Sequence, residues 1–275
     1  MVLSADLHIH STASDGCLEP RALLEIAKKN EVPTISLTDH DSLDNVASII
    51  NLSKQYGVEI LAGVELSSMW KGKDVHVLGY FIDYQSTWIK KELILFQAAR
   101  QKRAAKIVSL LKERKVDIDL REVTDLAGNG SISRAHLGRI LVKKGITRTM
   151  QEAFDKYLGE KASCYVAKDV LDSDQVISLI KKAGGVAVLA HPAVSNIDDD
   201  IPCLCKSGLE GLEVYHPDQT KKQQDYYYDL ANNLGLLVTG GTDFHGFGKN
   251  PIKIGDYGIS KMQLRLLKKA SKKSC

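Results

Sequence analysis

Several features are scarce or absent in this sequence of 275 residues, and each absence excludes a class of protein. The five cysteines are odd in number, and no pair has the two-residue gap of a zinc knuckle or a redox motif, which favours free thiols. The first residues lack a basic segment followed by a long apolar run, and no apolar stretch approaches ~20 residues. We therefore expect a cytoplasmic protein without a secretory signal and without a membrane partner.

A strong charge imbalance is also missing. The 37 basic and 34 acidic residues give a net charge of +3, which is too small to indicate nucleic-acid binding by bulk electrostatics. A hydrophobic fraction of 44% supports a substantial core, and the length suits one large α/β barrel or two modest domains. Nothing in the composition indicates an obligate protein partner.

Strand-like and helix-like segments alternate along the chain in two blocks. The first expected strand passes through Leu7 and Ile9, and the others cover residues 34–38, 58–65, 74–82, 186–190, 211–215 and 236–240. Pro20 indicates a helix start, and Ser42 is expected to cap the next helix. Such alternation is typical of an α/β fold with a largely parallel sheet.

The stretch between the two blocks has a different pattern. Helical periodicity covers residues 89–115, 119–126, 134–144 and 150–158, and glycines separate these segments. We interpret residues 88–165 as an all-helical insertion that forms a lid for the substrate. The barrel would then consist of residues 1–87 and 166–275.

The segment Asp6–Asp15, which reads Asp-Leu-His-Ile-His-Ser-Thr-Ala-Ser-Asp, is the most informative part of the chain. If Leu7 and Ile9 share one face of a strand, His8 and His10 share the other. Two imidazoles with this spacing can bind one cation. Asp15 follows in a short loop and can add an oxygen ligand.

Further imidazoles and carboxylates fall at or near the ends of other expected strands. The candidate metal ligands are His8, His10, Asp15, His40, Glu65, His76, His191, Asp243 and His245. In a parallel barrel the carboxyl ends of the strands meet at one mouth. Nitrogen and oxygen ligands without thiolate favour Mn²⁺, Zn²⁺ or Fe²⁺, and their number suits two or three ions. Such ions activate water, which explains why the sequence needs neither a Gly-x-Ser-x-Gly elbow nor a Walker-type loop.

At these residues the sequence resembles the PHP (polymerase and histidinol phosphatase) family, and most closely its TrpH-like metal-dependent phosphoesterases. The matching stretches are Asp6-Leu-His-Ile-His-Ser, Thr38-Asp-His-Asp41, Gly63-Val-Glu65, His76-Val-Leu-Gly-Tyr, Ala190-His-Pro192 and Thr242-Asp-Phe-His245. They occur in the family's order over nearly the whole chain. The resemblance implies a distorted (β/α)7 TIM-like barrel with a trinuclear metal site, in which Mn²⁺ is the first candidate.

The resemblance also implies a ligand set for each ion. His8, His10, Glu65 and Asp243 would hold the first ion; Asp15, His40 and His245 the second; and Glu65 would bridge to a third with His76 and His191. Many relatives have histidine at the position of Asp15, so this ligand differs in type. Members of the subgroup hydrolyse nucleotides such as 3',5'-bisphosphates and act on the 5' ends of short RNA.

Three further residues are candidates for contact with the substrate. Ser133 is expected to cap a helix, so that Arg134 and His136 lie in the first helical turn. A helix N-terminus with a guanidinium suits a phosphate, and the resemblance points to the same segment. His216 follows an expected strand and is a candidate for leaving-group acid or phosphate contact, although an orienting hydrogen bond is an equal alternative.

We therefore expect a metal-dependent phosphohydrolase acting on a small nucleotide phosphate or on short single-stranded RNA. A phosphatase of the histidinol-phosphate type is an alternative within the same chemistry. A metal-binding PHP module without catalysis is an alternative from another class, and an amide hydrolase on a similar barrel is a third.

Overall fold

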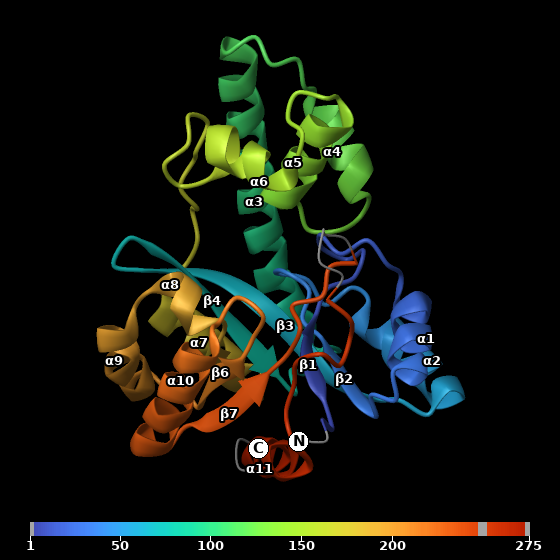
Figure 1. Ribbon diagram of the computed structural model, residues 1–275, viewed down its shortest axis with the longest axis vertical. Helices are drawn as coiled ribbons and strands as arrows, with labels where there is room; N and C mark the ends of the chain where they lie inside the picture. The colour runs from blue at the N-terminus through green and yellow to red at the C-terminus, as the bar shows by residue number, and fades with distance from the viewer. Residues whose placement is uncertain (1–2, 247–251, 273–275) are drawn as a thin grey trace.

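The structure of the protein is a computed structural model, in which residues 3–246 and 252–272 are described. Seven strands form one sheet in chain order (Figure 1). They are β1 Asp6–Ile9, β2 Thr34–Leu37, β3 Glu59–Trp70, β4 Lys73–Tyr80, β5 Val186–Leu189, β6 Gly211–Tyr215 and β7 Leu237–Gly240. β4 is antiparallel to both β3 and β5, and the other neighbouring strands are parallel. The expected α/β fold is thus present, with a mixed sheet.

The sheet is curled. Side chains of β1, β3, β4 and β5 share one buried cluster with the last helix, although β1 and β5 lie at separate places in the strand order. The Tyr80 hydroxyl of β4 donates to the Leu7 carbonyl of β1 over 3.1 Å. An isolated parallel bridge between Ile9 and Phe244 also links the end of β1 to the segment after β7. The curl encloses an interior whose apolar end, here called the floor, is this shared cluster of β1, β3, β4, β5 and the last helix.

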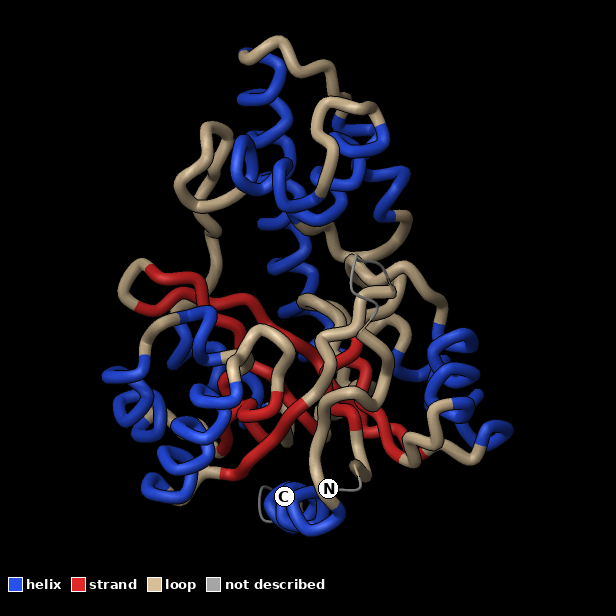
Figure 2. Tube along the Cα trace, viewed as in Figure 1, coloured by secondary structure: helices blue, strands red, loops and turns tan. Residues whose placement is uncertain are grey.

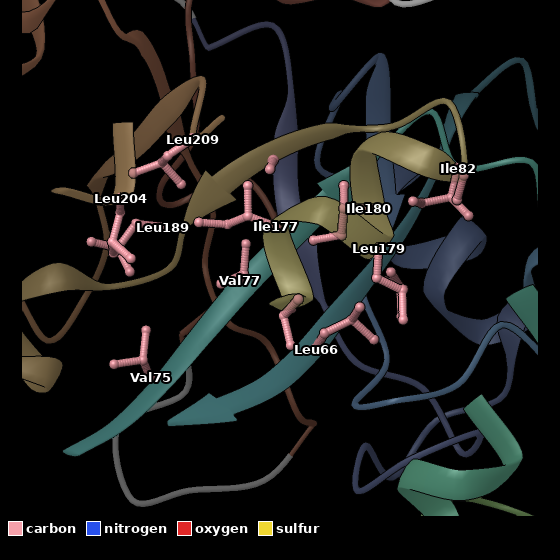
Figure 3. Close-up of a cluster of buried hydrophobic side chains, with 14 of the residues drawn as sticks. Leu66, Val75, Val77, Ile82, Ile177, Leu179, Ile180, Leu189, Leu204 and Leu209 are labelled. Carbon is pink, nitrogen blue, oxygen red and sulfur yellow. The ribbon is translucent and has the colours of Figure 1, made fainter. Parts of the chain in front are cut away.

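Helices surround the sheet on its outer side and at one end. They are α1 Pro20–Lys29, α2 Val46–Tyr56, α7 Ser173–Lys182, α8 Pro192–Ser195, the 3-10 helix η2 Asp198–Asp200, α9 Ile201–Lys206, α10 Lys221–Leu234 and α11 Lys261–Ser271. α11 lies near both chain ends and closes the floor through Leu264 and Leu267 (Figure 1). Figure 3 shows α7 packing Ile177 and Ile180 near Val77 of β4.

Residues 88–165 form helices and loops above the sheet, as Figure 2 shows. The helices are α3 Thr87–Glu113, α4 Leu120–Ala127, α5 Arg134–Lys143, α6 Met150–Ala153 and the π-helix η1 Phe154–Leu158. α3 belongs to two cores. Ile89, Leu93 and Phe96 pack with the sheet, whereas the part from Ala104 to Leu111 packs with α4 and α5. The domain boundary at residue 88 stays a prediction. The change from one core to the other lies within α3, between Phe96 and Ala104.

Three expectations from the sequence are wrong in detail. β3 continues past Glu65 to Trp70, because β4 pairs with it antiparallel over that length. His76, by contrast, lies within β4, as the strand expected over residues 74–82 predicts. Ser42 does not cap α2, since its hydroxyl donates to Asp44 and the helix begins at Val46.

The third concerns β1. Leu7 and Ile9 pack into different clusters, because the register of β1 against β2 shifts between Asp6 and Ile9. Cys17, Cys164, Cys203 and Cys205 are free thiols, and Cys275 lies outside the described residues. No described helix has the length and apolarity to cross a bilayer.

Candidate metal centre

Glu65 is the point at which most of the predicted ligands meet. Its carboxylate is buried in the middle of β3. The nearest imidazole nitrogens are His40 Nδ1 at 2.8 Å, His76 Nδ1 at 2.7 Å, His191 Nε2 at 3.1 Å, His10 Nε2 at 3.3 Å and His8 Nε2 at 3.4 Å. The histidines come from β1 and the residue after it, from β4, and from the segments that follow β2 and β5. The curl of the sheet thus brings together side chains that are far apart in the sequence.

Asp243 forms the second meeting point. Its Oδ1 atom lies 3.3 Å from His8 Nε2 and 3.0 Å from His10 Nε2. Asp15 forms a third, with Oδ1 3.2 Å from His245 Nε2 and Oδ2 3.9 Å from His40 Nε2. Each group offers imidazole nitrogen and carboxylate oxygen within 4.8 Å, a spacing at which one ion could be shared.

The loop that carries Asp243 and His245 is held by Asp6, at the start of β1. Asp6 accepts hydrogen bonds from the Thr242 amide at 3.0 Å, the Thr242 hydroxyl at 2.7 Å and the Gly255 amide at 2.9 Å. Burial raises the pKa of Asp6 to about 6, and these hydrogen bonds oppose the rise. A side chain at Gly241 would collide with the His8 backbone, so the close approach of this loop to β1 needs glycine.

The backbone is strained at two of the predicted ligands. Asp243 has φ of 49° and His191 has φ of 26°. Non-glycine residues rarely adopt such values, and they concentrate at functional sites. The geometry of both loops is therefore set by the surrounding hydrogen bonds and not by local preference.

Glu213 belongs to the site although the sequence analysis missed it. It lies fully buried in β6, where Oε1 is 2.9 Å from His8 Nδ1 and Oε2 accepts from the His191 amide at 2.8 Å. A carboxylate on Nδ1 keeps the proton there and leaves the Nε2 lone pair of His8 pointing into the cluster. The sequence did contain a signal for Glu213, since it is a charged residue inside an otherwise apolar strand. Burial of an unpaired carboxylate there would destabilise the fold, so a partner for it could have been expected.

The cluster contains buried polar atoms without hydrogen-bond partners in the described part of the chain. They include His8 Nε2, His10 Nε2, His40 Nδ1, Glu65 Oε2 and His216 Nε2. Native proteins seldom bury so many unsatisfied polar atoms together, and a bound ion is an ordinary reason for it. The residues present therefore fit a group of divalent cations.

Neighbouring imidazoles stabilise the ionised form of the carboxylates in the cluster. Burial opposes ionisation of Asp15, Glu65 and Asp243, but the adjacent imidazoles hold the pKa of each carboxyl well below its usual value. Burial likewise opposes protonation of His245, but Asp15 and Asp243 raise its pKa to about 10. Carboxylates kept ionised at neutral pH are suitable cation ligands.

The helical insertion is bonded to the loop that carries Asp15. The Ser131 amide donates to the Ala13 carbonyl at 2.9 Å, and an Arg139 guanidinium nitrogen donates to the Asp15 carbonyl. Between them, the His136 ring bonds to the backbone of Ser14. The position of Asp15 is thus fixed by α5 as well as by the sheet.

His136 is placed differently from Arg134, its neighbour in the first turn of α5. The His136 side chain is buried, and its Nδ1 accepts from the Ser133 amide at 3.0 Å in a capping box. Ser133 is the N-cap, as predicted. The contact of His136 with a phosphate stays a prediction.

Arg134 lies over the His76 side of the cluster with two partners. Its Nη2 is 3.4 Å from Asp74 Oδ2, and its Nη1 donates to the Leu158 carbonyl. Lys168, which the sequence analysis did not identify, lies on the same carboxylate, 2.9 Å from Asp74 Oδ1 and 2.8 Å from His76 Nε2. The two cations make this edge of the site suitable for an anion.

His216 lies beside Asp243, with 3.5 Å between Nε2 and Oδ2. Its side chain is buried, and Nδ1 accepts from the Asp218 amide at 3.1 Å. A neutral His216 therefore carries its proton on Nε2, the atom that faces the cluster.

A curled α/β sheet that gathers imidazoles and carboxylates at its mouth is the arrangement of a metal-binding protein. A comparison with known protein families points to the same class, because the PHP domain matches residues 6–169. The chain belongs to the PHP domain family.

Relatives of similar length support this assignment. A 5'-3' exoribonuclease of Haemophilus influenzae is 33% identical over 89% of this chain and 91% of that protein. A 3',5'-nucleoside bisphosphate phosphatase of Chromobacterium violaceum is 29% identical over 91% of this chain and 90% of that protein. Among solved structures, a protein of Bifidobacterium adolescentis described as a metal-dependent phosphoesterase is 28% identical and matches with a TM-score of 0.90, covering 97% of this chain and 96% of that one.

Proposed function

We propose that this protein is a metal-dependent phosphohydrolase that cleaves phosphate esters of nucleotides, such as nucleoside 3',5'-bisphosphates, or acts on the 5' ends of short RNA. The observation that carries the proposal is the meeting of His40, His76 and His191 on the buried carboxylate of Glu65. Relatives that match over nearly the full chain are phosphoesterases, and they supply the substrate class. The fold behind this site would be a distorted (β/α)7 barrel.

The proposed ligand sets follow the three meeting points. His8, His10, Glu65 and Asp243 would hold one ion; Asp15, His40 and His245 a second; and Glu65, His76 and His191 a third. Mn²⁺ is the first candidate, with Zn²⁺ or Fe²⁺ as alternatives. Such ions supply an activated water at neutral pH and offset the negative charge of a phosphoryl group.

The protein's own residues would do the remaining work. Arg134, at the first turn of α5, would hold the phosphate oxygens with its guanidinium, and the positive end of the helix dipole favours an anion there. Glu213 would keep His8 in the tautomer that ligates. The Nε2 proton of His216 would pass to the leaving-group oxygen, which becomes an alcohol.

The test uses purified protein reconstituted with Mn²⁺ and adenosine 3',5'-bisphosphate. Phosphate release should require the metal, stop with a chelator, and fall at least about 1,000-fold in Asp243→Ala, since a metal ligand is lost. Asp229→Ala, an exposed carboxylate on α10, is the matched control and should keep full activity.

The other outcomes identify the rival functions. Bound metal with no turnover across nucleotides and short RNAs would favour a non-catalytic module. Turnover of histidinol phosphate alone would favour a phosphatase of that type, and turnover of a cyclic amide without any phosphate ester would favour an amide hydrolase.

A further inference from the structure

A cavity of about 740 Å³ opens beside the Asp243 edge of the metal cluster. Asp243 and His245 are part of its lining, so the cavity borders the proposed metal site. Its apolar walls are Leu18, Ile26, Met150, Phe154 and Phe244. They come from the sheet domain and from the insertion together, so the space exists only where the two parts meet.

Phe154 connects this cavity with the proposed phosphate ligand. It is the first residue of the π-helix η1, an element that often occurs at functional sites. Its ring lines the cavity, and the guanidinium carbon of Arg134 lies 5.7 Å from the ring centroid. A ligand whose phosphate reached Arg134 would thus have an aromatic surface beside its adjoining group.

The two other cavities near the centre have different chemistry. One of about 420 Å³ is lined by Glu19, Asp44 and Asp125, whose negative charges disfavour a nucleotide. The other, of about 390 Å³, contains Arg134 and His76 and is suited to phosphate oxygens. Of these cavities only the largest combines apolar walls, an aromatic ring and direct access to the cluster.

Ionic and polar groups at the large cavity refine the ligand further. Lys29 and Lys253 line it and favour a polyanion. The Asn30 side-chain nitrogen, also in the lining, donates to the Ile254 carbonyl at 2.8 Å. The described lining thus offers stacking surface and positive charge but little hydrogen-bond readout.

We propose that this cavity holds the nucleobase of the substrate, stacked on Phe154, and that it accepts the four bases with little selectivity. The inference rests on the proposed function and adds to it the part of the substrate that the metals do not contact. Stacking tolerates sequence because every base has an aromatic face.

The experiment compares kcat/KM for adenosine 3',5'-bisphosphate with kcat/KM for 1,4-anhydroribitol 3,5-bisphosphate, which keeps both phosphates and the sugar ring but has no base. Loss of one stacked base weakens binding by about 5- to 150-fold. Phe154→Ala should lower the ratio of the two constants by about that factor, chiefly through KM. Phe154→Tyr, which keeps the ring, should stay within about twofold of the wild type. Leu18→Ala, in a different element, should lower the ratio in the same direction.

An unchanged ratio in folded Phe154→Ala and Leu18→Ala would overturn the base site. A preference above about 100-fold for one base would overturn its tolerance. If wild-type protein hydrolyses neither ester, the proposed function fails, and fluorescence titration with 2-aminopurine riboside still tests the cavity. Quenching that Phe154→Ala loses and Phe154→Tyr keeps would support it, and no quenching by wild type would overturn it.

Discussion

Replacement of Glu213 by glutamine tests whether an orienting carboxylate controls the affinity for metal. Glu213 accepts from two donors at once, His8 Nδ1 at 2.9 Å and the His191 amide at 2.8 Å. Glutamine has a single acceptor oxygen, so one of these contacts must meet an NH₂ group instead. Burial opposes ionisation of Glu213, but His8 and His216 hold its pKa below the usual value, so the native group is charged at neutral pH.

The magnitude follows from the position of Glu213 behind the ligand. Loss of such an orienting partner weakens metal binding by about 10- to 100-fold, which corresponds to about 1.4–2.7 kcal/mol. We expect Glu213→Gln to show this loss in a competition titration with a fluorescent chelator. Phosphate release should recover when Mn²⁺ is raised by the same factor, because the proposed ligands remain.

Glu210→Gln is the matched control, since Glu210 lies three positions away and pairs with Lys181 near the surface. Its affinity for metal should change by less than about twofold, as expected for a partly exposed ion pair. Equal affinity in wild type and a correctly folded Glu213→Gln would refute the argument that Glu213 sets the tautomer of His8.

Three further predictions follow from the same geometry. Arg139→Gln removes a donor to the Asp15 carbonyl and should weaken metal binding about 3- to 30-fold with an unchanged circular dichroism spectrum; unchanged affinity would contradict it. His245 has a pKa of about 10 without metal, raised by Asp15 and Asp243 against the effect of burial, and it must be neutral to ligate. Burial opposes protonation of His8 as well, but Glu213, Asp243 and Glu65 raise its pKa well above the usual value. Binding should therefore release at least one proton at pH 7.5, with affinity rising by at least about tenfold per pH unit; calorimetry in buffers of different ionisation enthalpy measures it, and zero release would contradict it. Leu111→Ala in the insertion core should destabilise the protein by about 2–5 kcal/mol in urea unfolding. The transition should stay single, because α3 joins both cores, and a biphasic curve would contradict that.

The sequence predicts much of the site because its chemistry is carried by residue types that are rare at strand ends. His8 and His10 in one strand, and Asp243 and His245 in one loop, are visible without any coordinates. Helix positions were also predictable within a few residues, since apolar periodicity and caps such as Ser133 are local signals.

The parts that the sequence analysis missed depend on pairing between distant segments. The length of β3 is set by its antiparallel partner β4, and local composition does not contain that information. Glu213 gave no motif, and its two partners lie on other strands. Lys168 follows the insertion in a segment without regular structure, so only the folded chain shows its contact with His76.

The contacts between the helical insertion and the sheet argue against a loosely attached lid. A mobile lid would need few bonds to the site and its own core, yet α3 contributes Phe96 to the core of the sheet and Leu111 to that of the insertion. α5 also bonds to the loop of Asp15 through Arg139, and Arg100 of α3 pairs at 2.5 Å with Asp41, which follows His40. Movement of the insertion would therefore disturb the Asp15 and His40 group directly. Cavities already lie between the insertion and the sheet. We therefore expect substrate to enter through these cavities and not by opening of the insertion as a unit.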